Sequence, residues 1–504
     1  MQERHPTFET ASRRSVILYT RFTTPNRMVN QLTCLALMTF CRSKLNVSAL
    51  MAIAMLLLGT VANAIEPFQI KVIDAENGWP VPLVELRTTH HVRMVTDNAG
   101  VVAFDLPELM DTEVWLEIEG HGYSVPKDGF GYRGVRVTPT EGGEVTIKVN
   151  RRLPAKRLGR ITGGGLFAES QKLGQHLDWQ EQRILGCDSV QNAIRGNKLY
   201  WCWGDTTLAS YPLGRFNTIG GVTDLKPLSV FQPPVKLRYD YFTDDAGVPR
   251  DVAPMPGSGP TWLMGNACLK DREGNDRIVS TYSKIRPPLE EYEVGLCVWN
   301  DSTNEFERTK VLWEKTEDQR RPQPTPQGHA VAWQDEEGKS WMLFGDPLPT
   351  LRCPATFESW LDPTTWEVLQ PQRSIPTKDN QDSIRPHRGA IAWNSYRDKW
   401  ITVFTQFGGD SSQLGELWYA EADSPLGPWK DAIKVVTHNR YTFYNPQVHP
   451  EFTEDGSPLL LFEATYTYTF SSTTDPTPRH DYNQVLYRLD LDELVADHQF
   501  DAKP

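Results

Sequence analysis

The chain has 504 residues, of which 39% are hydrophobic and 23% charged, a composition typical of a soluble globular protein with one large and one smaller domain. Its formal net charge of −12 disfavours a nucleic-acid partner, because phosphate binding needs clustered Lys and Arg. This charge is more compatible with a neutral or cationic ligand, or with solubility alone. The 16 Trp, 17 Tyr and 20 Phe supply flat rings that fill sheet cores and can also stack on sugars.

The N-terminal region carries an export pattern. Two basic residues precede an apolar run from Val47 to Val61, which ends at Ala62-Asn63-Ala64, the small-x-small pattern of a signal-peptidase site. The run is short for a membrane span. We therefore predict cleavage after Ala64 and a periplasmic or extracellular mature chain without a stable membrane span. The long stretch before the run favours an internal translation start, such as Met28.

Cysteine usage follows from that prediction. Cleavage removes Cys34 and Cys41 and leaves an odd number of cysteines in the mature chain. An oxidising compartment permits disulfides, but their pairing cannot be read from sequence. No C-x-x-C spacing indicates a zinc or redox site. The cysteines that remain are Cys187, Cys202, Cys268, Cys297 and Cys353.

Residues 65–153 alternate apolar and polar side chains in short runs, such as F-Q-I-K-V-I-D and V-T-I-K-V. Turn residues separate the runs, as at Glu76-Asn77-Gly78, and this spacing predicts a β-sandwich. The run V-I-D-A-E-N-G-W-P-V-P-L-V-E-L, followed by T-D-N-A-G-V-V-A-F, resembles the carboxypeptidase-regulatory-like, or prealbumin-like, sandwich. The resemblance implies an accessory domain without an activity of its own. Residues 154–183 are predicted to be a linker and lead-in, after the targeting segment at 1–64 and the sandwich.

A strand–turn–strand pattern opens beyond residue 184. Asp188 begins it, a turn follows at Arg195-Gly196-Asn197, and the strand Leu199–Trp203 leads to Asp205. Gly-Asn between two β-patterned runs is a hairpin signal. The pattern returns roughly every 55 to 60 residues, in G-H-A-V-A-W-Q-D-E-E-G-K-S-W-M-L-F-G-D-P for example, giving five copies. We predict an all-β fold, with a five-bladed β-propeller over 184–504 behind the small sandwich.

Alignment of the five copies predicts which side chains face the propeller axis. The starts of the first strands and the ends of the second strands carry varied polar residues. Such variety favours an asymmetric polar pocket at one end of the axial channel. The residues at these positions are Asp188, Asp205, Asn266, His329, Asp346, Arg388, Gln406, Gln447, His449 and Glu463.

The first copy, G-C-D-S-V with G-N-K-L-Y-W-C-W-G-D-T, resembles the opening blade of an endo-D-arabinanase-like propeller family. The later Y-N-P-Q-V-H-P and S-P-L-G-P-W stretches are similar to blades of the same family and of other arabinanase- and furanosidase-type propellers. The resemblance implies that the two catalytic aspartates of that family correspond to Asp188 and Asp205. Cys187 and Ser189 depart from the family pattern. These departures bear on the identity of the substrate more than on the location of the site.

The residues themselves also indicate glycoside hydrolysis. A hairpin brings the start of one strand beside the end of the next, so Asp188 and Asp205 should lie together at one end of the axial channel. Glycoside hydrolysis uses such a pair of carboxylates. Glu463 is the best third carboxylate, because it ends the second strand of the last blade. The other axial residues are predicted to bind substrate, and Arg388 should pair with an axial carboxylate. No cofactor is expected; a metal held by His329, His449 and Gln447 is the less favoured alternative.

Two rival functions are left open. A polysaccharide lyase could use His329, Arg388, His449 and Tyr282, and would release unsaturated, ultraviolet-absorbing products. A glycan-binding propeller would use the acids only to hydrogen-bond hydroxyls. We favour an exported hydrolase of a furanose- or uronate-containing polysaccharide. The alternatives to Asp188 and Asp205 as functional residues are turn capping and solvated strand ends.

Overall fold

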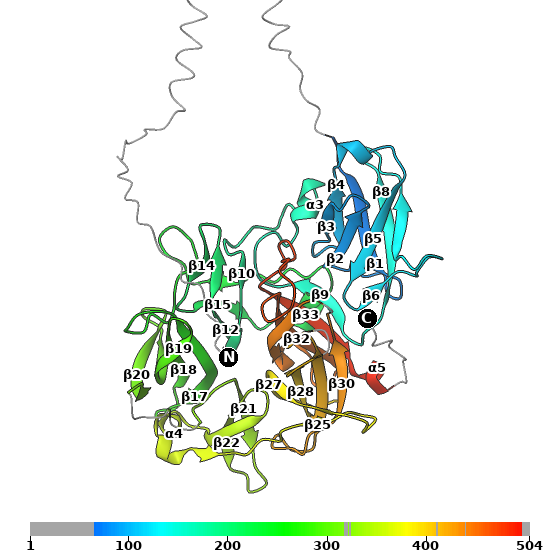
Figure 1. The fold of residues 1–504 in the computed structure, drawn as a ribbon. Helices are drawn as coiled ribbons and strands as arrows, with labels where there is room; N and C mark the ends of the chain where they lie inside the picture. Colours follow the sequence, from blue (N-terminus) through cyan, green and yellow to red (C-terminus); the bar gives the residue numbers. More distant parts are fainter. Residues whose placement is uncertain (1–64, 317–320, 322–323, 410–411, 439, 496–504) are drawn as a thin grey trace, which may run out of the picture. The chain divides into compact units, whose positions relative to one another are not determined.

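A computed structural model describes residues 65–316, 321, 324–409, 412–438 and 440–495 (Figure 1). The chain divides into two units, Met1–Ala64 and Ile65–Pro504, and the predicted export signal lies outside the described residues. Strands make up nearly all of the regular secondary structure of the described chain. None of its helices has the length and apolar character to cross a membrane.

The first domain is a β-sandwich, as predicted. Its strands form one continuous sheet in the order β3-β2-β5-β6-β8-β1-β4, with β7 paired to β5. Strand β1 pairs with β8 in parallel and with β4 in antiparallel orientation. The bounds are β1 Phe68–Asp74, β2 Val84–Thr88, β3 Arg93–Val95, β4 Val101–Phe104, β5 Val114–Gly120, β6 Tyr123–Ser124, β7 Gly134–Val137 and β8 Glu144–Arg151.

The period-two pattern of the sandwich sequence sets its core. Along β1 every second side chain is buried, beginning with Phe68 and Ile70. These side chains pack against Leu86 from β2, Leu116 from β5 and Val149 from β8 in one hydrophobic cluster. One face of β1 is thereby buried in the core of the sandwich, and the opposite face is more exposed to solvent.

Five four-stranded antiparallel sheets follow, which confirms the predicted five-bladed propeller (Figure 1). From inner to outer strand, blade one is β11 Gln191–Arg195, β12 Lys198–Trp203, β15 Ile219–Asp224 and β16 Asp240–Tyr241. Blade two is β17 Thr261–Lys270, β18 Asp276–Arg286, β19 Glu290–Asn300 and β20 Glu305–Glu314. Blade three is β21 His329–Gln334, β22 Ser340–Gly345, β23 Pro349–Pro354 and β24 Glu367–Val368. Blade four is β27 Pro386–Asn394, β28 Lys399–Gln406, β29 Leu417–Ala422 and β30 Lys430–Val436, and blade five is β31 Thr442–Val448, β32 Leu459–Thr467, β33 Asn483–Asp490 and β9 Lys156–Arg160.

Short elements complete the described chain. A three-stranded sheet beside blade one consists of β10 Gly186–Cys187, β13 Thr206–Leu208 and β14 Tyr211–Arg215. A two-stranded sheet pairs β25 Ile375–Pro376 with β26 Ser383–Ile384. The helices are α3 Ala168–Lys172, α4 Phe357–Leu361 and α5 Leu491–Val495, with 3-10 turns at Pro107–Leu109, Leu228–Phe231, Pro363–Thr365 and Pro450–Phe452.

The hairpin of blade one forms where the sequence predicts it. Arg195 pairs with Lys198 across a two-residue turn, and Gly196 adopts a φ of 63°, which glycine reaches without strain. The predicted strand Leu199–Trp203 is β12. Its end therefore returns beside the start of the hairpin, where the backbone N–H of Gly204 donates to the carbonyl oxygen of Asp188 at 2.8 Å.

The ring is closed by a strand from before the first blade. Strand β9, Lys156–Arg160, pairs antiparallel with β33 and becomes the outermost strand of blade five. The linker prediction for residues 154–183 is therefore wrong in its first part. The segment K-R-L-G-R lacks the apolar–polar alternation of a strand, but all five residues are buried, because the sandwich and blade five cover its two faces.

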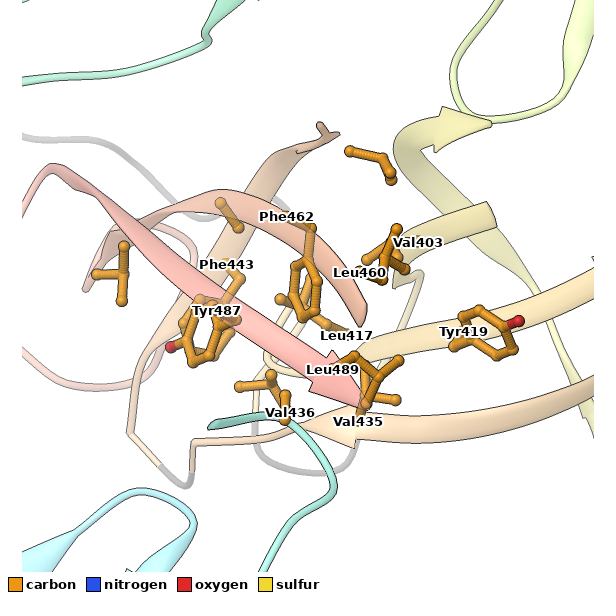
Figure 2. Close-up of a cluster of buried hydrophobic side chains, with 14 of the residues drawn as sticks. Val403, Leu417, Tyr419, Val435, Val436, Phe443, Leu460, Phe462, Tyr487 and Leu489 are labelled. Carbon is orange, nitrogen blue, oxygen red and sulfur yellow. The ribbon is translucent and has the colours of Figure 1, made fainter. Parts of the chain in front are cut away.

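Blades four and five share the largest hydrophobic cluster of the described chain (Figure 2). Aliphatic side chains such as Val403 and Leu417 from blade four pack against Phe443, Phe462 and Tyr487 from blade five. Each blade alone would expose this apolar surface, so stacking of neighbouring blades stabilises the ring. The five cysteines of the described residues are free thiols, and four of them are buried among such side chains.

Candidate active site

The five inner strands all begin at one end of the axial channel. We call this end the aspartate mouth, because Asp188 precedes β11 and Asp205 follows β12 there. The indole N–H of Trp262, near the start of β17 in blade two, donates to Asp205 at 3.3 Å. The hairpin turns, including Gly196, lie at the opposite end. The predicted meeting of the two aspartates at one mouth agrees with this geometry, since the backbone N–H of Asp205 hydrogen-bonds the Asp188 carboxylate.

Asp188 is half-buried and surrounded by hydrogen-bond donors. The hydroxyl of Tyr444 donates to its Oδ2 atom at 2.5 Å. Burial raises the pKa of Asp188 above its usual range, while hydrogen bonds from Tyr444, Tyr482 and Ser189 and from the backbone of Asp205 act in the opposite direction. The donors favour the ionised carboxylate over the protonated form.

Asp205 has a different environment. Burial, followed by the negative charge of Asp188, raises the pKa of Asp205 to about 7. The Trp262 indole N–H alone acts to lower it. Because Asp188 has several donors and Asp205 one, the pair favours a state near neutral pH in which Asp188 is ionised and Asp205 carries the proton.

A second charged pair lies across blades three and four at the same mouth. Arg388, within the bulge of β27, forms an ion pair with Asp346, which follows β22. The other carboxylate oxygen of Asp346 accepts the backbone N–H of Gly389 at 2.8 Å. The predicted pairing of Arg388 with an axial carboxylate is thus found. Gln406, at the end of β28, accepts the indole N–H of Trp418 at 2.9 Å.

Three further predicted residues lie deeper along the axis. Asn266, His329 and Gln447 line a cavity of about 420 Å³ that extends towards the turn end, away from the aspartates. Inner-strand side chains of all five blades contribute to it, and its wall is mainly apolar. Burial lowers the pKa of His329 to about 4, so its imidazole is neutral. These side chains are axial, as predicted, and His329, the first residue of β21, lies near enough to Asp346 and Arg388 for their charges to act on it.

Glu463 and His449 require a correction. Both are fully buried, with side-chain exposures of 0%, and they do not open onto the aspartate mouth. Nε2 of His449 lies 2.8 Å from Glu463 and its Nδ1 lies 2.9 Å from Glu451, so the ring is held between two carboxylates. The two glutamates outweigh the effect of burial and raise the pKa of His449 to about 9. His449 and Glu463 are closed off within blade five, while Glu451 reaches the wall of the axial cavity and accepts from Asn192 of blade one at 3.4 Å.

The residues proposed for a lyase lie in different environments, although His329 is near enough to His449 and Arg388 for their charges to act on it. Tyr282 is fully buried and donates to Glu293 at 2.5 Å, while His449 is buried between two glutamates. Only Arg388 of that set lies exposed at the aspartate mouth. Among the described residues no group of three His, Cys, Asp or Glu side chains could hold a metal ion.

Several contacts of the aspartate pair were missed by the sequence reasoning. Tyr444 lies in the Y-N-P-Q-V-H-P stretch, which carried a family resemblance but no assigned role. Tyr482 lies just before β33, and Trp262 in β17; no spacing or motif marks either one. Their contacts with the aspartates cross from one blade to the next, a relation that repeat alignment does not reveal.

The fold and mouth define a five-bladed propeller with paired aspartates at one end of its axis. No family model and no curated protein matches the chain. Solved structures with a related arrangement include an exo-1,5-α-L-arabinanase from a bovine ruminal metagenomic library, at 10% identity over 61% of this chain and 95% of that chain, with a TM-score of 0.35. An arabinanase from Bacillus subtilis has 11% identity over 60% and 96% of the two chains, with a TM-score of 0.31. An exo-β-1,3-galactanase from Phanerochaete chrysosporium has 9% identity over 60% of each chain, with a TM-score of 0.34. Likeness at this level carries no argument about activity, and the strand pairing of the chain itself defines the propeller.

Proposed function

We propose that this protein is a glycoside hydrolase acting on a furanose- or uronate-containing polysaccharide. The single observation that carries the proposal is the unequal environment of two neighbouring aspartates at one mouth of the propeller. Asp188 receives several hydrogen bonds that favour its ionised form, whereas burial and the charge of Asp188 raise the pKa of Asp205 to about 7. Glycoside hydrolysis needs one carboxylate and one carboxylic acid beside the scissile bond.

The roles follow from these environments. Asp205, protonated near neutral pH, gives its proton to the glycosidic oxygen as the leaving group departs. Asp188 acts as the carboxylate, either attacking the anomeric carbon or taking a proton from the attacking water. A carboxyl separation of about 5 Å corresponds to the first route and retention, and about 6.5–9.5 Å to the second and inversion. The anomer first formed, followed by proton NMR, distinguishes the two routes.

Exposed aromatic rings at the same end support a carbohydrate substrate. Phe470, 58% exposed, lies edge-on to Tyr444 with ring centroids 6.1 Å apart. Phe407, 39% exposed, follows β28 and lies under the guanidinium of Arg385 at 4.4 Å. Flat apolar rings beside polar donors are suited to sugar faces, which are apolar across the ring and polar at the edge.

The proposal is tested by incubating the protein with a panel of arabinans, galactans and uronate-containing polysaccharides. We expect the wild type to release new reducing ends but no ultraviolet-absorbing unsaturated products. Asp188→Asn should release neither kind of product. Unsaturated products would instead identify a lyase. Polysaccharide binding that is the same in the wild type and in Asp188→Asn, with no cleavage by either, would identify a binding module.

We also propose that the protein is exported and begins at Ile65 once the signal is removed. The support is the apolar run that ends at Ala62-Asn63-Ala64 in the sequence. N-terminal sequencing of protein recovered from the periplasm or medium should start at Ile65. A recovered chain that still carries residues before Val47 would contradict cleavage.

A further inference from the structure

Two tyrosine hydroxyls from blade five meet the carboxylate of blade one. Tyr444, on β31, donates to Oδ2 of Asp188 at 2.5 Å. Tyr482, in the turn before β33, hydrogen-bonds the same carboxylate and also interacts with Tyr444. The charges of both Asp188 and Asp205 act on Tyr482, so its hydroxyl lies close to the pair. Neither contact occurs within a blade; both cross the seam at which the ring closes.

The backbone around this seam is held in uncommon conformations. Ser189, Asn445 and Tyr482 have positive φ angles of 51°, 47° and 60°, which side-chain-bearing residues adopt at a cost in free energy. Nδ2 of Asn445 donates to Oγ of Ser189 at 2.5 Å, and the backbone N–H of Ser189 donates to Oγ1 of Thr465 at 3.3 Å. Strained residues from both sides of the seam are thus tied together beside Asp188.

The strain has a geometrical result. A bulge interrupts the pairing of β31 with β32 between Tyr444 and Gln447, and Asn445 lies within it. Bulges re-aim side chains relative to a regular strand. Tyr444 therefore points across the seam to Asp188, while Gln447, three residues further on, lines the axial cavity.

The two hydroxyls stay protonated in this environment. Burial is the main cause that raises the pKa of Tyr444 and of Tyr482, and the nearby Asp188 charge adds to it. A hydroxyl that keeps its proton donates to a carboxylate and stabilises its negative charge. Among the described side chains, Asp205 has no tyrosine partner of this kind, and the indole of Trp262 is its hydrogen-bond donor.

We propose that Tyr444 and Tyr482 are positioning residues that hold Asp188 in its ionised form and in a fixed orientation, so that blade five decides which aspartate of the pair serves as the carboxylate. The catalytic part of this inference rests on the proposed glycoside hydrolase function; the effect on Asp188 itself does not. Both tyrosines act through Asp188, and neither needs to touch the substrate.

The test uses Tyr444→Phe, Tyr482→Phe and the double variant of the full protein. Phenylalanine keeps the ring and removes only the donor. Tyr239→Phe is the matched control, because the Tyr239 hydroxyl is buried without a hydrogen-bond partner in the described structure. With ¹³C-labelled aspartate carboxyl groups, and Asp188→Asn to assign the signal, the titration of Asp188 is followed by NMR.

Each single variant should raise the titration midpoint of Asp188 by about one pH unit, the scale of one lost hydrogen bond to a charged group, and the double variant by more. Tyr239→Phe should leave the midpoint unchanged. A midpoint that stays at the wild-type value in both single variants and in the double variant, with near-ultraviolet circular dichroism showing a folded protein, overturns the proposal.

Turnover supplies the second measurement on any polysaccharide that the wild type cleaves. We expect kcat to fall in the tyrosine variants with KM held, and the acid limb of the pH–rate profile to move upwards with the Asp188 midpoint. Wild-type cleavage with an unshifted acid limb in the variants contradicts the positioning role. Shifted NMR midpoints in a wild type that cleaves nothing support the tyrosine contacts and contradict the hydrolase function alone.

Discussion

Asp188→Asn and Asp205→Asn are each expected to lower turnover by at least roughly two to three orders of magnitude, the scale of a lost acid or base. Asparagine keeps the shape of the side chain but neither ionises nor gives up a proton. Steady-state kinetics on the polysaccharide found in the screen measures the loss. Asp224→Asn is the matched control, because Asp224 is an exposed aspartate at the end of β15 in the same blade.

Stability separates loss of chemistry from loss of folding in these variants. The folded pKa of Asp205, about 7, lies above its ordinary value of 3.8. The contribution of this group to stability is therefore fully present below pH 3.8 and is lost as the pH rises through 7. Asp205→Asn removes a carboxylate that is costly to ionise, so its melting temperature at pH 8 should equal or exceed that of the wild type. An inactive variant that melts well below the wild type at pH 8 would contradict a purely catalytic role.

His449→Leu should lower the free energy of unfolding by about 3–5 kcal/mol, the cost of leaving buried charges without their partner. The variant leaves Glu463 and Glu451 facing each other across an apolar side chain. Denaturant unfolding at pH 6 measures the difference. His90→Leu is the control, because His90 forms an exposed pair with Glu108 at 3.3 Å, and such surface pairs contribute little.

The effect should depend on pH with a definite sign. The pKa of His449 is about 9 in the folded protein and 6.5 ordinarily, so the stability from its protonation is fully present below pH 6.5 and is lost as the pH rises through 9. The difference between wild type and His449→Leu should therefore narrow between pH 7 and pH 10. A constant difference over that range would show that packing, rather than charge, accounts for the loss.

Local sequence signals were enough to predict the blades. The Gly196-Asn197 turn and the apolar alternation after it specify β11 and β12, and four similar copies specify the ring. Strand β9 was missed because its residues, K-R-L-G-R, carry no alternation and its partner β33 is distant in sequence. Burial by the sandwich and by blade five, rather than local propensity, makes that segment a strand.

The part of the site that depends on the topology of one hairpin could be predicted from the sequence. The part that depends on which face of a strand each side chain occupies could not. Asp188 and Asp205 flank the same hairpin, so topology alone brings them together. Glu463 was expected to end its strand as Asp205 does, but β32 continues to Thr467, so Glu463 lies within the strand and contacts the buried His449. The bulge in β31 changes which face of the strand the following side chains occupy. Alignment of the repeats cannot reveal this shift, and the contact of Tyr444 with Asp188 was missed for that reason.

Strand β9 is synthesised before any blade, whereas its partner β33 leaves the ribosome only after the rest of the propeller. Throughout that interval β9 is an unpaired strand, and an unpaired strand edge is a template for association with other chains. Only when Asn483–Asp490 has been made does the seam form on which the contacts of Tyr444 and Tyr482 with Asp188 depend. A chain that lacks β33 therefore leaves β9 unpaired and the ring open beside the aspartate mouth.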